Sequence, residues 1–195
     1  MSFLTGTQTE QLYSLSSAIT KNTYTTEAAF TGVLGTNTVC KLDAGYFRNG
    51  VPNPVGRTLY LRVQGLIANT AAATFAVNLG FDPTAGTKAN SVTVMAATAP
   101  VATFTAPFTL EAWYTCTAFV TSQMTLQVNG FWIMEGGNAG GAAVATALRT
   151  GFQGSISGAT MDPRVDNYIE LFGTWSVSNA ANTTTVHQML LFGLN

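Results

Sequence analysis

The single histidine of the chain, His187, is the first residue whose type could support catalysis. With Ser176 or Ser178 and a carboxylate, it could activate a serine nucleophile for acyl transfer. Such a site needs the serine on an exposed turn beside an oxyanion hole, and the sequence contains no GxSxG motif. A histidine among threonines in an alternating segment is typical of a hydrogen-bonded strand, so we expect His187 to be structural.

Carboxylates offer two further kinds of site. Asp162, Asp166 and Glu170 lie close in sequence and could give oxygen ligands to Ca²⁺, but the residue order of an EF-hand is absent. We expect instead a charged loop in which Arg164 offsets the acids. Glu111 and Glu170 could form a glycosidase pair, although nothing in the sequence places them across one cleft. We therefore expect no enzyme activity, no metal site and no cofactor.

The two cysteines, Cys40 and Cys116, are too few and too far apart in sequence for a zinc site. A reducing cytosol would keep both as thiols. We expect two buried free thiols, and the alternative is a disulfide between them.

Strands that would position these residues are indicated by alternation of apolar and polar side chains. In "TLYLRVQG", Leu59, Leu61 and Val63 share one face, while "TFAVNLGF" aligns Phe75 to Phe81 in the same way. Further alternating segments begin at Ser91, Leu110, Met124, Tyr168 and Thr183, with turn-forming residues between them. The pattern predicts an all-β fold, an antiparallel β-sandwich of jelly-roll type over residues 31–195. The Gly/Ala-rich residues 136–151 are predicted to form a flexible loop.

Residues 1–30 differ from the rest of the chain. Helical spacing occurs only between Glu10 and Ile19, and it is short. We interpret residues 1–30 as an extended N-terminal arm or edge strand that docks on a neighbour rather than on its own core. The interface candidates in this arm are Leu12, Tyr13 and Leu15.

The composition of the chain limits the kinds of partner that it is expected to bind. Charged residues make up 9% of the chain and the net charge is -1, so no field attracts a polyanion, and we expect no nucleic acid. Lys41, Arg57 and Arg62 are predicted to be isolated solvated or interface charges. We expect no membrane span and no secretory signal, and therefore synthesis in the cytoplasm. So few charges indicate a surface that is largely covered in an assembly.

Aromatic residues on outward strand faces are candidates for that contact. A neighbouring subunit that covers them is the favoured interpretation, because exposed apolar patches mark interfaces. The alternative is a carbohydrate platform on which Trp113 or Trp132 stacks against sugar. The aromatic residues predicted to face outward are Trp113, Phe119, Tyr168 and Phe172.

The C-terminal segment "TWSVSNAANTTTVHQ" closely resembles the ending of small virion-type proteins of tailed bacteriophages. Members of this group also tend to carry an "AGYF…GRTLYLRVQG" unit, matched here by Ala44 to Phe47 and Gly56 to Gly65. A middle "TLEAWYTCTA" unit is matched by Thr109 to Ala118. The resemblance spans residues 40 to 195.

This resemblance implies a virion structural protein of capsid decoration, minor capsid or minor tail type. Decoration proteins of this sort resemble β-sandwich trimers on the outer capsid. The implied function is to bind the major capsid protein as a homotrimer and to stabilise the assembled head, on the phage head surface. The alternative is a tail-tip or tail-fibre module that binds host surface glycans. No catalytic residue carries over from the group.

Overall fold

The structure is a computed structural model in which every regular element is a β-strand, and all strand pairs are antiparallel. The all-β prediction is thus confirmed. None of the residues that the structure describes forms a helix long and apolar enough to cross a membrane. The described residues are 9–15, 17–22, 28–29, 40–47, 54–69, 73–98, 104–120, 122–134, 138–139, 142–143, 148–157 and 161–194.

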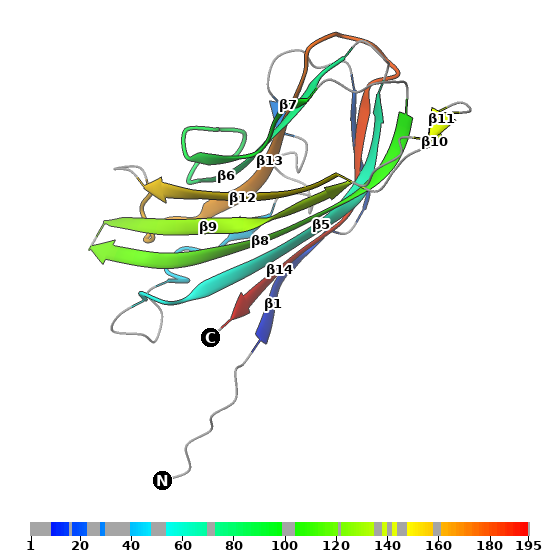
Figure 1. The fold of residues 1–195 in the computed structure, drawn as a ribbon. Coiled ribbons are helices and arrows are strands. Elements are labelled where there is room, and N and C mark those ends of the chain that lie inside the picture. The colour runs from blue at the N-terminus through cyan, green and yellow to red at the C-terminus, as the bar shows by residue number, and fades with distance from the viewer. Residues whose placement is uncertain are drawn as a thin grey trace.

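The larger of two main sheets has the strand order β1-β14-β5-β8-β9-β12, and β2 also pairs with β14. We call it the large sheet. Its long strands curve around the rest of the molecule (Figure 1). The strand bounds are β1 Thr9–Ser14, β2 Ile19–Asn22, β5 Thr58–Asn69, β8 Phe104–Val120, β9 Gln123–Met134, β12 Leu148–Ser157 and β14 Thr183–Leu194.

The second sheet, here the small sheet, has the order β3-β13-β6-β7, with β4 also paired to β13. It forms the second layer of the fold (Figure 1), as in a β-sandwich. A separate short hairpin joins β10 to β11. The bounds are β3 Ala28–Ala29, β4 Lys41–Leu42, β6 Phe75–Asp82, β7 Ser91–Thr98, β10 Asn138–Ala139, β11 Ala142–Ala143 and β13 Asn167–Trp175.

One hydrophobic core lies between the sheets, and the alternation of β5 shows how the sequence builds it. Leu59, Leu61 and Val63 are fully buried, whereas Tyr60 and Arg62 on the other face keep partial exposure. The predicted face of β5 is therefore confirmed. Aromatic pairs reinforce the core from both layers, where they remove large apolar areas from water. The closest pairs are Phe108 with Trp132 at 4.6 Å and Phe75 with Trp175 at 4.3 Å.

Strand β12 was not predicted. Its first residues, Leu148 to Gly151, fall in the segment expected to be a flexible loop, and that expectation is wrong for them. Phe152 and Ile156 of β12 are buried, and a Cβ on Gly154 would lie 2.6 Å from Val92 of β7. Gly154, just beyond the predicted loop, thus allows the two strands to approach closely. Most of the remaining predicted loop lies outside the described residues.

The N-terminal segment forms strands on its own chain. The outer edge of β14 is covered in turn by β2, by a 2.9 Å hydrogen bond from the Leu15 N–H to the Met189 carbonyl, and by β1. Leu12, Tyr13 and Leu15 pack against the chain's own core. The described residues between Glu10 and Ile19 form no helix. The prediction that this segment docks on a neighbour instead of on the chain's own core is wrong for β1 and β2. The backbone groups at the edge of β14 are a nearer hydrogen-bonding partner for the N-terminal segment than a neighbouring molecule is.

Candidate functional site

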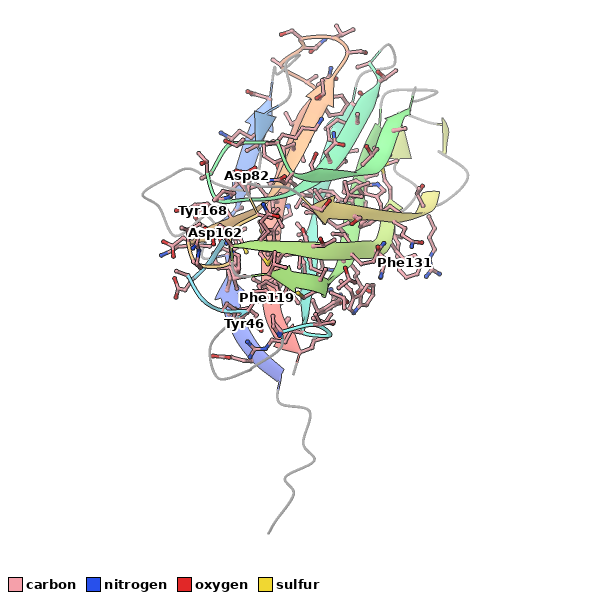
Figure 2. The ribbon with its side chains drawn as sticks, turned by 90° about the vertical axis from the view of Figure 1, so that its left-hand side faces the viewer. Tyr46, Asp82, Phe119, Phe131, Asp162 and Tyr168 are labelled. Atoms are coloured by element: carbon pink, nitrogen blue, oxygen red, sulfur yellow. The ribbon has the colours of Figure 1, made fainter. Side chains whose placement is uncertain are left out.

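One end of the sandwich is formed by four segments that hydrogen bond to each other in a ring. The N–H of Gly45 donates to the Pro163 carbonyl at 2.9 Å, and that of Met124 donates to the Met161 carbonyl at 3.0 Å. Other links join Gly56 to Cys116 and Arg57 to Tyr46. Figure 2 shows Tyr46, Phe119 and Asp162 at this end. We call residues 43–47, 54–57, 116–120, 122–124 and 161–166 the loop end.

Charges at the loop end are paired. The Nζ of Lys41 lies 2.9 Å from an Asp166 oxygen and 3.1 Å from an Asp43 oxygen. The hydrogen bond from Lys41 lowers the pKa of Asp166, as does the backbone N–H of Ala44. Lys41 is therefore not the isolated charge that we expected.

The Arg164 guanidinium lies 2.6 Å from Asp162, as the sequence predicted. Asp162 and Asp166 thus have separate cationic partners, and Glu170 binds a different loop. Within the described residues, no group of three His, Cys, Asp or Glu side chains could hold a metal ion. The carboxylates at this end hold loops in place.

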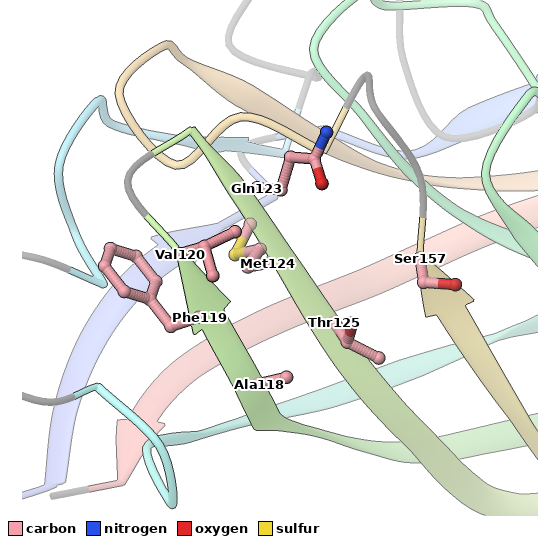
Figure 3. A pocket seen from close by; sticks show the side chains of 7 residues that line it. All are labelled: Ala118, Phe119, Val120, Gln123, Met124, Thr125 and Ser157. Carbon is pink, nitrogen blue, oxygen red and sulfur yellow. The ribbon is translucent and has the colours of Figure 1, made fainter.

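Three valines stand exposed among these paired charges. A shallow pocket of about 280 Å³ opens beside one of them, Val120, at the turn between β8 and β9. Figure 3 shows its lining, which comes from both strands and from the end of β12. The loop end therefore presents fixed apolar groups with little unpaired charge, which is the composition of an interface core. The exposed fractions are 46% for Val55, 61% for Val120 and 43% for Val165.

Phe119 does not lie on the face predicted for it. A register shift between Cys116 and Ala118 marks a β-bulge in β8, after which Phe119 pairs with the buried Met124. One extra residue moves every following side chain to the opposite face. Phe119 is consequently half-buried against the core instead of sharing the face of Glu111.

Aromatic rings form a row across the outward face of the large sheet. From β14 to β9 the successive ring centroids are 6.1, 5.2 and 6.3 Å apart. The guanidinium of Arg149 lies 4.5 Å from the last ring, in cation–π geometry. Trp113, an interface candidate from the sequence, is half-buried within this row. We call Phe192, Tyr60, Trp113 and Phe131 the aromatic strip.

Sequence reasoning found only Trp113 of the strip. Its other members lie far apart in the chain, and only strand register aligns them: Tyr60 pairs with Phe192 on one side and with Trp113 on the other. The sequence nevertheless contained a signal for two members of the strip. Tyr60 and Phe131 occupy the polar face of alternating strands, where a large aromatic side chain is out of place.

Polar groups border the strip. The Nε of Arg62 lies 3.9 Å from a Glu111 oxygen, a loose ion pair, and makes no hydrogen bond with the described residues. Arg62 is thus not the isolated charge expected of it. A second shallow pocket, of about 340 Å³, lies beside Phe131 over two glycines, and its polar walls are Asn129 and Gln153.

Two aromatic predictions are wrong. Phe172 is only 2% exposed, because it packs across Gly80 and its strand β13 lies between β3 and β6. It is therefore not available to a neighbouring subunit. Trp132 is fully buried against Phe108 and cannot stack on a sugar. Tyr168, also predicted to face outward, is half-buried.

The outward face of the small sheet is covered by the loop that joins β6 to β7. The Gly86 N–H in this loop donates to a Glu170 oxygen at 2.6 Å, and Asp82 accepts from Thr84 and Asn90 at 3.0 Å each. Burial raises the pKa of Glu170, the Asp82 charge adds to the rise, and the Gly86 N–H opposes it. Glu111 lies on the other sheet, so the two glutamates do not form a glycosidase pair.

His187 occupies a β-bulge. The register of β14 against β5 shifts between Val186 and Gln188, which leaves His187 exposed beside a shallow pocket of about 390 Å³. The pocket also contains Gln64, which lies 3.5 Å from the hydroxyl of Thr109. Ser176 has a different role, because its hydroxyl accepts a 2.8 Å hydrogen bond from the Thr74 N–H.

Both cysteines are buried free thiols, as predicted. Burial raises the pKa of Cys40, and the negative charge of Glu170 adds to the effect. Burial also raises the pKa of Cys116. Neither thiol is in the electropositive, accessible setting that makes a cysteine reactive.

Compared with known proteins, the chain matches no family model, no curated protein and no solved structure. Its surface chemistry therefore has to indicate its function. The two surfaces with a defined chemistry are the loop end and the aromatic strip.

Proposed function

We propose that the chain is a structural protein of a tailed-phage virion, a capsid decoration protein of cement or minor capsid type. It binds the major capsid protein as a homotrimer on the head surface and stabilises the assembled head. The observation that carries this proposal is the loop end, where Val55, Val120 and Val165 stand exposed on segments held by hydrogen bonds.

A preorganised apolar surface suits this role. Because the ring of hydrogen bonds already fixes the loops, docking orders few additional groups and loses little conformational entropy. The pairing of Lys41 with Asp166 and of Arg164 with Asp162 leaves little unpaired charge to desolvate. Many copies that bind only the assembled lattice add their binding free energy to the stability of the shell.

Part of the sequence that carries the resemblance to virion proteins lies on the same surface. Ala44 to Phe47 and Gly56 to Arg57 belong to the loop end, where the Arg57 guanidinium lies 5.0 Å from the Tyr46 ring centroid. The proposed function thus links two independent observations. One is the sequence resemblance, and the other is the exposed apolar end.

Two pairings support a jelly-roll type of sandwich. Strand β5 lies beside the last strand, β14, and β6 lies beside the next to last, β13, as in Greek-key connections. The hairpin of β6 with β7 inside one sheet is a departure from the simplest jelly roll.

We infer a role in binding rather than catalysis. Asp82, Asp162, Asp166 and Glu170 all accept hydrogen bonds that fix loops. An acid or base in catalysis would instead face a substrate in a cleft.

The direct test is the addition of purified protein to phage shells that lack it. We expect saturable binding, measured by co-sedimentation, and greater resistance of the shells to heat. Val120→Asp and Val165→Asp should abolish both, because a charge would then be desolvated in the interface. Val177→Asp is the matched control, since Val177 is 42% exposed in the turn after β13, away from the loop end. Shells that gain no resistance would contradict the proposal.

Location is tested separately by a cryo-EM map of the virion that carries the chain. Density at capsomer junctions on the head supports a decoration protein. Density at the tail tip would contradict it and would favour the tail module that binds host surface glycans.

A further inference from the structure

The aromatic strip is a narrow row of rings, in which Phe131 stands at 85° to Trp113 and has the Arg149 guanidinium over its ring. Strand register places its rings on four adjacent strands, β14, β5, β8 and β9, so that the row crosses the sheet perpendicular to the strands. With strands about 4.8 Å apart, the row is about 14 Å long. Figure 2 shows Phe131 on the opposite side of the molecule from Asp82 and Tyr168, which belong to the small sheet. The strip is thus separate from both the loop end and the small sheet.

The exposed area of the strip is too small for a protein partner. None of its rings is more than 38% exposed, because each ring shields the next. Rings of about 150–250 Å² each then present at most roughly 230–380 Å² in total. A stable protein interface needs about 800 Å² on each side. The strip alone would therefore supply less than half of such a surface, which favours a smaller ligand.

The same strip matches the faces of sugar rings. The C–H groups on one face of a pyranose carry partial positive charge and pack on the negative face of an aromatic ring, which removes both from water. Several rings in a row suit several sugars in a chain. The extended shape and the modest exposed area both favour a linear oligosaccharide.

Polar groups at the borders of the strip suit sugar hydroxyls. The Arg62 and Glu111 side chains are 43% and 32% exposed and only loosely paired, at 3.9 Å, and Glu111 also forms a hydrogen bond with the Tyr60 hydroxyl, so both polar groups lie where a ligand on the strip can reach them. Asn129 and Gln153 border the pocket beside Phe131, where Gly151, whose Cβ would have no neighbour closer than 4.0 Å, leaves room above the backbone. This pocket, about 340 Å³, lies at one end of the row and could hold a terminal sugar.

We infer that the outward face of the large sheet binds a linear oligosaccharide, with Tyr60, Trp113 and Phe131 as stacking platforms and Arg62 and Glu111 as hydrogen-bonding groups. This inference does not rest on the proposed capsid function. It concerns a different surface and holds wherever the protein is located.

Intrinsic fluorescence provides a specific test, because two of the three tryptophans, Trp132 and Trp175, are buried in the core. A sugar on the strip should therefore change the emission of Trp113 alone. The probes are maltohexaose, cellohexaose and chitohexaose, together with an array of immobilised glycans. We expect a saturable emission change with at least one probe, and the same affinity by titration calorimetry.

Variants separate stacking from folding. Phe131→Ala and Tyr60→Ala keep the Trp113 reporter and should weaken binding about tenfold. Trp113→Phe should retain more affinity than Trp113→Ala in calorimetry, because an aromatic face remains. Val120→Ser at the loop end is the control and should bind as the wild type does. Circular dichroism would verify the fold of each variant.

Two results would overturn the inference. One is the absence of saturable binding to every probe and array glycan by the wild type. The other is a fall in oligomer mass when Trp113→Ala is folded, which would make the strip a subunit contact. Failure of the protein to bind phage shells would leave the sugar site unaffected, so the two proposals fail separately.

Discussion

Gly130 shows how much the large sheet depends on one missing side chain. A Cβ at this position would lie 2.1 Å from the carbonyl oxygen of Glu111 and 2.7 Å from the Phe152 ring. The carbonyl belongs to the pairing of β8 with β9 and cannot move without breaking that pairing.

We therefore expect Gly130→Ala to lower the free energy of unfolding by about 1–3 kcal/mol, through overpacking. Gly151 on the adjacent strand is the matched control, because the nearest atom to its Cβ would be 4.0 Å away. Gly151→Ala should change stability by less than about 0.5 kcal/mol. Urea unfolding of both variants measures the difference, and equal effects would contradict the packing at Gly130.

The Glu170 carboxyl, on the small sheet, makes the free energy of unfolding depend on pH. Its pKa is raised in the folded protein, mainly by burial, so the folded state holds the proton more tightly than the unfolded chain does. The free energy of unfolding should then decrease as the pH rises from the ordinary pKa of a glutamate through the folded pKa. Protonation of Glu170 thus stabilises the fold at low pH, and that contribution is lost as the pH rises through the folded pKa.

Glu170→Gln removes this dependence, because a glutamine does not titrate and can still accept the Gly86 hydrogen bond. We expect the stability of the variant relative to the wild type to increase between about pH 4 and about pH 8. Urea unfolding across this range measures the relative stability. Glu111→Gln, on the outward face of the large sheet, is the comparison variant. A relative stability of Glu170→Gln that is flat or falls with pH would contradict the assignment.

At the scale of elements, β1 belongs to the core of its own chain. Leu12 and Tyr13 pack against that core, and β1 pairs with Leu190 to Leu194 of β14. Deletion of residues 1–15 should lower the free energy of unfolding by at least about 2 kcal/mol, from the lost apolar burial. Hydrogen exchange should show faster exchange in Leu190 to Leu194.

A point substitution tests the same strand without truncation. Leu12→Ala should destabilise the isolated protein, whereas Gln11→Ala, at an exposed neighbouring position, should not. Unchanged stability of both the deletion and Leu12→Ala would mean that the strand serves a neighbouring chain, as the sequence had suggested.

The alternation of apolar and polar residues predicted strands well where each face of a strand has a single environment along its length, either the core or the outside. Strand β5 has a buried and an outward face along most of its length, so its period of two is clear in the sequence. The same reasoning fails at β-bulges. The extra residues near Thr117 and at His187 depend on the register with the partner strand, and the local sequence does not mark them.

The outward face of the small sheet could not be predicted because a distant loop covers it. Glu170 and Phe172 alternate with core residues as exposed side chains would, yet the β6–β7 loop and packing across Gly80 bury them. Strand β12 was missed because its glycines are typical of loops. The aromatic strip needed strand register, which a single sequence does not provide.

At the scale of the whole molecule, the sparse charge of the surface favours assembly. With 9% charged residues, a free monomer of this size lacks the mixed surface charge that keeps proteins apart. We expect multi-angle light scattering to give a mass three times that of the 20.5 kDa chain, in keeping with closed cyclic symmetry. A monomer at micromolar concentration would contradict the proposed homotrimer. Trp113→Ala should leave this mass unchanged.

The pairing of Thr9 with Leu194 brings the start of β1 beside the end of β14, and Leu194 in turn pairs with Thr58, next to the loop end. A protein fused directly before Thr9 or directly after Leu194 would therefore emerge beside the proposed docking surface and compete with the shell for space. The turn at Asn179 to Ala181 lies at the far end of β14 and is exposed. Foreign peptides intended for display on a particle belong in that turn, where insertion is best tolerated.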